Sequence, residues 1–79
     1  MSRLVVLAVD DREPSVPEGL TEAERAVALL LFSGCTNDQI AVARGVSERT
    51  VAKQVSAVLQ KAGVASRTEL VVRMLGQVG

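Results

Sequence analysis

The segment at residues 36–63, TNDQIAVARGVSERTVAKQVSAVLQKAG, carries two helix start signals and two helix stop signals in close succession. Thr36 and Ser47 are residue types that cap helix N-termini, and Gly45 and Gly63 suit the left-handed backbone with which helices often end. After Ser47, apolar residues recur three and four positions apart, which is the spacing of one helix face: Val51, Val55, Val58, Leu59 and Ala62. The segment therefore predicts a short helix and a longer one over 47–62, joined by a turn at Gly45-Val46.

Helices are also predicted on both sides of this pair. Thr21 and Glu24 form a capping-box pattern, in which each side chain bonds the backbone N–H of the other residue, and they open a helix over 22–33. Ser66 and Glu69 repeat the pattern ahead of a last helix that stops at Gly76. No strand pattern follows residue 20, so we expect an all-α, four-helix domain over 20–79.

The amino-acid composition argues against several classes of function. The 79 residues include no histidine and one cysteine, so they cannot assemble a zinc site or a disulfide framework, and we expect no cofactor. No convergent acid, base and nucleophile can be found, which argues against an enzyme. No apolar run approaches the roughly 20 residues of a membrane-spanning helix. We expect a cytoplasmic domain with no membrane partner and no evident small-molecule ligand.

The net charge of zero is unevenly distributed along the chain. Residues 1–38 carry three basic and seven acidic residues, whereas residues 39–79 carry six basic and two acidic ones. This asymmetry indicates an anionic partner for the C-terminal half, although a solvated basic face would give the same pattern.

Two helices around a short glycine-containing turn have the spacing of a helix-turn-helix, whose second helix lies in the DNA major groove. Helical bundles that bind no DNA can show the same spacing. The identities of particular residues are more specific than the spacing. These residues are LTEAER at 20–25, Leu30-Leu31, Gly34, Asn37, Ile40-Ala41, GVSERTV at 45–51 and KAGVASRTEL at 61–70. Together they closely resemble the DNA-binding domain of LuxR-type regulators, also called FixJ-, NarL- or GerE-type. The resemblance covers residues 20 to about 75.

The resemblance implies that the third helix reads the major groove and that the fourth commonly dimerises the domain on a two-fold DNA site. It places Ala52, Lys53 and Ser56 at base edges. Contacts with the DNA backbone are implied for Arg49, Thr50, Gln54 and Lys61, with Asn37 near the phosphates at the start of the second helix. For the dimer contact we expect Leu70, Val71, Met74 and Leu75 of the fourth helix.

Two positions depart from the family pattern. Family members usually carry a lysine where Ala52 stands, and often a histidine where Gln54 stands. The loss of charge at Ala52 is expected to lower affinity and to change the preferred sequence, although alanine can still contact a thymine methyl.

Residues 1–19 are expected to form an N-terminal arm and linker. The run LVVLAV at 4–9 favours an extended segment or a strand. Pro14 and Pro17 mark the linker that follows it. Ala26 and Leu29 stand where the family usually has charged residues, so we expect the run at 4–9, from the same or a second chain, to cover them. Val5, Leu7 and Leu29 are therefore a second candidate dimer interface. The alternative is that the alanines reflect helix propensity alone.

These observations predict a small transcriptional regulator that binds double-stranded DNA sequence-specifically as a homodimer. The alternative is a protein-interaction module, in which the same fold binds another regulator or RNA polymerase and DNA binding is weak or absent. Ala52 and the neutral net charge favour this alternative.

Overall fold

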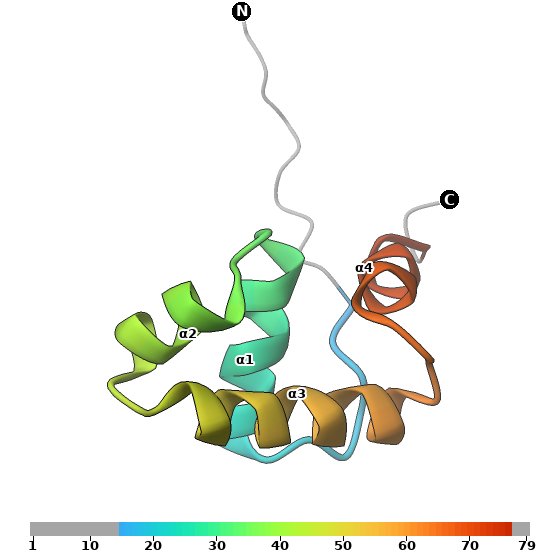
Figure 1. Cartoon of the computed structure of the whole chain (residues 1–79). Helices are drawn as coiled ribbons and strands as arrows, with labels where there is room; N and C mark the ends of the chain where they lie inside the picture. Colours follow the sequence, from blue (N-terminus) through green and yellow to red (C-terminus); the bar gives the residue numbers. More distant parts are fainter. Residues whose placement is uncertain (1–14, 77–79) are drawn as a thin grey trace, which may run out of the picture.

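The computed structural model describes residues 15–76, and within this range the chain forms four helices and no strand. The helices are α1 (Glu22–Phe32), α2 (Asn37–Arg44), α3 (Glu48–Ala62) and α4 (Arg67–Gly76), as Figure 1 shows. The all-α, four-helix prediction is confirmed. The segment predicted to be extended, residues 4–9, lies outside the described residues.

The helices pack around α1. Its main contact is with α3, which runs along the base of the molecule in Figure 1. Helices α2 and α4 lie on opposite sides of α1, and a hydrogen bond from Arg67 to Asn37 joins their first residues. The helix pair α2–α3 therefore forms one end of the molecule, and the N-terminal half of α3 is held from above by α1 and α2.

Side-chain caps explain where the helices start. The Thr21 hydroxyl accepts from the Glu24 N–H at 3.1 Å, and the Glu24 carboxylate accepts from the Thr21 N–H at 3.0 Å, which confirms the predicted capping box of α1. At α4 the prediction is only half met. Ser66 caps the Glu69 N–H, but the Glu69 carboxylate accepts from the N–H of Ala65 at 2.8 Å, one residue before the expected one.

The turn between α2 and α3 depends on a left-handed residue. Gly45 has φ +72°, and its N–H donates to the Ala41 carbonyl at 2.8 Å, which closes the end of α2. Two residues later the Ser47 hydroxyl accepts the Thr50 N–H at 3.1 Å and starts α3. A side chain at this position would strain the left-handed backbone, so the turn between α2 and α3 depends on glycine.

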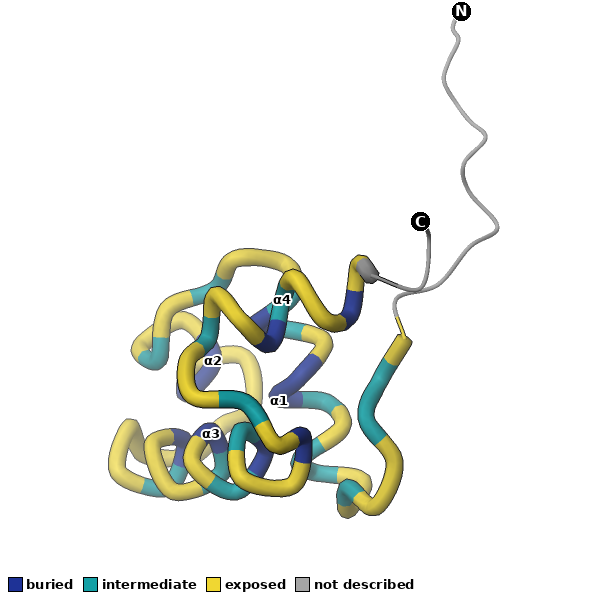
Figure 2. The backbone as a smooth tube through the Cα atoms, turned by 90° about the vertical axis from the view of Figure 1, so that its right-hand side faces the viewer, coloured by how far each residue is buried: buried dark blue, intermediate teal, exposed yellow. Residues whose placement is uncertain are grey.

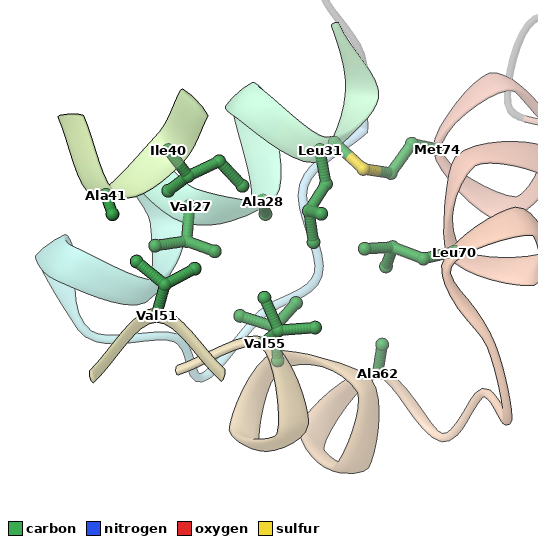
Figure 3. Packing of buried hydrophobic residues seen from close by; sticks show 11 residues of the cluster. Val27, Ala28, Leu31, Ile40, Ala41, Val51, Val55, Ala62, Leu70 and Met74 are labelled. Atoms are coloured by element: carbon green, nitrogen blue, oxygen red, sulfur yellow. The ribbon is translucent and has the colours of Figure 1, made fainter. Parts of the chain in front are cut away.

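The core is aliphatic and draws on every helix (Figure 3). The α3 stripe contributes as predicted through four residues, while its fifth member, Leu59, is only partly buried. The buried residues are Val27, Ala28, Leu31, Ile40, Ala41, Val51, Val55, Val58, Ala62, Leu70 and Met74. In Figure 2 the buried positions of α3 lie on the side that faces the rest of the bundle. The inward side of α3 is therefore fully used by packing.

Residues 15–20 run along the side of the bundle, from the level of α4 down to that of α3 (Figures 1 and 2). Val16 and Leu20 pack against the core, and the Ser15 N–H donates to the Met74 carbonyl at 3.2 Å. The packed domain thus includes residues 15–19, which the sequence assigned to the linker. Across the described range, no helix is long and apolar enough to cross a membrane.

Leu70→Ala is expected to lower the free energy of unfolding by about 2–5 kcal/mol, because the truncation leaves a cavity in the core. Val72→Ala, two positions later on the exposed side of α4, is expected to change it by no more than about 0.5 kcal/mol. Urea titration followed by circular dichroism measures both. Equal losses would contradict the placement of Leu70 in the core.

Candidate nucleic-acid interface

The outward side of α3 is a continuous exposed face. Its five residues follow the helical spacing and are all exposed: Arg49, Ala52, Lys53, Ser56 and Gln60. The core stripe of Val51, Val55 and Val58 lies on the opposite side of the same helix. With 15 residues, α3 is about 22 Å long, which is enough to lie along a major groove about 12 Å wide. The structure thus places Arg49, Ala52, Lys53 and Ser56 on one exposed face of α3.

The remaining predicted residues of α3 border this face. Thr50 is half-buried, and its hydroxyl oxygen accepts from the Ser47 hydroxyl at 3.1 Å, so its own hydrogen is available to an acceptor such as a phosphate oxygen. Gln54 is half-buried, and no donor in the described chain reaches its buried Oε1. The fold therefore supplies no fixed partner for the Gln54 amide oxygen.

The six basic residues of the C-terminal half fall into two sets of three. One set makes bonds within the fold: Lys61 Nζ pairs with Glu24 Oε1 at 2.7 Å, Arg67 donates to Asn37 Oδ1, and Arg73 Nη1 donates to the Ala62 carbonyl at 2.8 Å. The other set, Arg44, Arg49 and Lys53, is exposed, and within residues 15–76 it shows no such bond. The unengaged basic side chains thus belong to the end of α2 and the first half of α3.

Two predicted DNA-contact residues therefore have structural partners that sequence reasoning missed. The half-buried Asn37 lies in a cleft between the α1–α2 loop and α4, where Arg67 donates to its amide oxygen. Lys61 joins the end of α3 to the start of α1 through Glu24. These contacts span 30 and 37 residues of sequence, and no local pattern signals them.

The Lys61–Glu24 pair also changes the acidity of Glu24. The hydrogen bond from the Lys61 ammonium, followed by that from the Thr21 N–H, lowers the pKa of Glu24 below its ordinary value of 4.5. Glu24 therefore caps α1 and anchors α3 with one carboxylate, and it does so in its charged form.

The residues predicted to form the dimer contact are divided by burial. Leu70 and Met74 are 0% and 1% exposed and belong to the core, so they offer no surface to a second chain, which corrects that expectation. Val71 is half-buried and Leu75 is 49% exposed. Val72, 59% exposed, was missed although it lies three residues before Leu75, on the same helix face.

Only one residue of the second candidate dimer interface, Leu29, lies within the described residues. Leu29 is 37% exposed on α1 and Ala26 is half-buried, so part of the apolar surface expected to be covered is open in the described chain. Val5 and Leu7 lie outside the described residues.

Four helices, a glycine-capped turn between α2 and α3 and an exposed polar face on α3 define a helix-turn-helix domain. Residues 18–74 match the model of the luxR family of bacterial regulatory proteins, and the chain belongs to this family. Membership confirms the predicted LuxR-type resemblance and places the chain among regulatory proteins rather than enzymes.

Two relatives illustrate the match. The chain is 44% identical over 54 residues to the DNA-binding transcriptional activator DevR/DosR of Mycobacterium tuberculosis, a match that covers 68% of this chain and 25% of the relative. It is 41% identical over 56 residues to the spore germination protein GerE of Bacillus subtilis, which covers 71% of this chain and 76% of GerE. The chain thus matches about a quarter of the first relative and about three quarters of the second.

The Lys61–Glu24 pair predicts a specific pH dependence. Because the folded protein holds Glu24 at a lowered pKa, the unfolded chain binds its proton more tightly, and stability rises with pH through the carboxylate range. The contribution is complete above pH 4.5 and is lost as pH falls through the folded-state pKa. Glu24→Gln is therefore expected to reduce the difference in unfolding free energy between pH 7 and pH 3.

Urea titrations at the two pH values measure this difference. Glu22→Gln, in the same helical turn, is the matched control, because it removes the same charge and leaves the ion pair with Lys61 intact. A Glu24→Gln protein that kept the wild-type pH difference would contradict a role for the pair in stability.

Proposed function

We propose that the chain is a small transcriptional regulator that binds double-stranded DNA sequence-specifically, with α3 in the major groove. The observation that carries the proposal is the division of α3 into a core stripe and an exposed face that holds Arg49 and Lys53. Basic side chains on this face release counterions when they meet phosphates, which is the main source of DNA affinity. The name of the first relative, a DNA-binding transcriptional activator, supports the same function.

The individual roles follow from side-chain chemistry. Lys53 can donate to guanine O6 and N7, the Ser56 hydroxyl can donate to or accept from a base edge, and Ala52 can contact a thymine methyl. Arg49 lies on the same face, Thr50 and Gln54 border it, and all three can donate to phosphate oxygens. Lys61 would have to share its ammonium with Glu24, so we assign it mainly to the fold rather than to DNA.

We further propose a homodimer formed through the outer side of α4. The corrected contact set is Val71, Val72 and Leu75, the apolar residues of α4 that are not fully buried in the core. A two-fold dimer would place two copies of α3 on successive half-sites about one helical turn, roughly 34 Å, apart.

One observation favours the alternative of a protein-interaction module. Val42 is 77% exposed on α2, the first helix of the helix-turn-helix, where a partner such as RNA polymerase could cover it. Single exposed valines are common on protein surfaces, so DNA binding remains the preferred proposal.

Selection of bound duplexes from a random DNA pool tests the proposal. We expect enrichment of a motif with two-fold symmetry. For a duplex carrying that motif, we expect Lys53→Ala to reduce the slope of log affinity against log salt by about one unit if Lys53 meets a phosphate, since one counterion-releasing contact is then lost. No enrichment at low salt, with the protein shown to be folded, would instead favour the interaction module.

The matched control for the salt slope is the double replacement of Glu24 and Lys61 by glutamine. It removes one basic residue and keeps the net charge, so the slope is expected to stay at the wild-type value. A drop of a full unit would mean that Lys61 leaves Glu24 to contact DNA.

Leu75→Asp is expected to weaken self-association, because it places a charge on the proposed α4 contact while the core stays intact. Sedimentation velocity should show dimer only at concentrations at least about tenfold above those of the wild type, a cost of roughly 1.4 kcal/mol. Arg44→Asp, at the exposed end of α2, introduces the same side chain away from α4 and should leave the dimer unchanged. Unaltered dimerisation of Leu75→Asp would place the contact elsewhere.

A further inference from the structure

An apolar cleft of about 510 Å³ lies beside α4 and is open to solvent. Its walls come from α4 and from the end of α1 with the loop that follows it. The residues that line it include Leu31, Cys35, Arg67, Val71 and Val72. Val72 is 59% exposed, and Leu75, further along the same side of α4, is 49% exposed. The cleft and these two exposed side chains lie on the same helix.

We propose that the chain's own apolar segment, residues 4–9 (LVVLAV), occupies this cleft. The run consists entirely of aliphatic residues, and in an extended conformation alternate side chains such as Val5, Leu7 and Val9 share one face. That face matches the aliphatic wall made by Leu31, Val71 and Val72.

The point at which residues 1–14 join the described chain supports this occupant. The Ser15 N–H donates to the Met74 carbonyl, so the chain enters the domain at the C-terminal end of α4. Six residue steps separate Val9 from Ser15 and span up to about 20 Å. The distance along α4 from Met74 back to Thr68, on the cleft wall, is about 9 Å. The tether therefore reaches the cleft without being fully extended.

Charge is also complementary. Asp10, Asp11 and Glu13 lie between the apolar run and Ser15. On the cleft side, Arg67 lines the wall, and its guanidinium donates to Asn37. A guanidinium has five N–H donors, so Arg67 can donate to a carboxylate of the tether and still keep its bond to Asn37.

A tethered segment also has an advantage over a second copy. A short linker holds it at an effective concentration in the millimolar range, whereas a standard interface between two chains buries about 800 Å² on each. Because the proposed dimer uses Val71, Val72 and Leu75, the docked segment would compete with a second copy for α4. This last consequence rests on the proposed function, whereas the docking itself does not.

Cys35, the single cysteine of the chain, lines the cleft and reports its occupancy. We expect the combined replacement Val5→Asp and Leu7→Asp to speed alkylation of Cys35 by about tenfold, as for a segment at millimolar effective concentration that binds with a dissociation constant on the order of 0.1 mM. Val72→Asp, on the cleft wall, should raise the rate in the same way. Val42→Asp, on exposed α2, is the control and should leave the rate unchanged.

The rates are measured on the full chain at concentrations where sedimentation shows a monomer, and circular dichroism checks that each variant keeps its helices. Equal rates for the wild type and the Val5/Leu7 variant would overturn the proposal. A difference found only where the protein sediments as a dimer would assign the cleft to a second copy and overturn it as well. Alkylation involves no DNA, so a failure of the proposed DNA binding would leave this test unaffected.

Discussion

The packing of α3 against α1 is the interaction on which the rest of the structure depends. Val51 and Val55 meet Val27, Ala28 and Leu31 in the core (Figure 3). Val58 belongs to the same cluster, whose buried members include no aromatic ring, and the partly buried Phe32 packs against it. Each fully buried valine or leucine side chain contributes about 1.5–3 kcal/mol through removal from water. Together with the contacts that α2 and α4 make, this packing uses the whole inward side of α3. It therefore also determines which side chains of α3 face solvent. The proposed DNA-reading face is therefore a direct consequence of the core.

The polar interactions divide the basic residues by position in the fold. Lys61, Arg67 and Arg73 hold the ends of α3 and α4 to their neighbours, whereas Arg44, Arg49 and Lys53 remain exposed at the helix-turn-helix. The excess of basic residues in the C-terminal half of the sequence therefore includes two kinds of residue, those bonded within the fold and those that are exposed. Only the exposed set bears on an anionic partner directly, because the bonded side chains would have to give up or share an existing contact.

Most of the fold could be predicted from signals between neighbouring residues of the sequence. The caps at Thr21, Thr36 and Ser47 and the left-handed Gly45 act within one helical turn, so they can be recognised from neighbouring residues alone. The five-residue valine-rich stripe of α3 was predicted for the same reason, and four of its members are buried. The predictions were less accurate at α4, where Leu70 and Met74 were assigned to a dimer surface and lie in the core.

What the sequence by itself determined is the set of four helices, the position of the turn and the apolar stripe of α3, because periodicity and capping depend only on residues close in the chain. The resemblance of individual residues indicated the family. The tertiary structure alone decided which apolar residues of α4 face inward, and that Asn37 and Lys61 are bonded to Arg67 and Glu24. Apolar residues cover more than one side of α4, so its orientation is set by the helices packed against it. Contacts between residues 30 or more positions apart likewise exist only once the helices have packed.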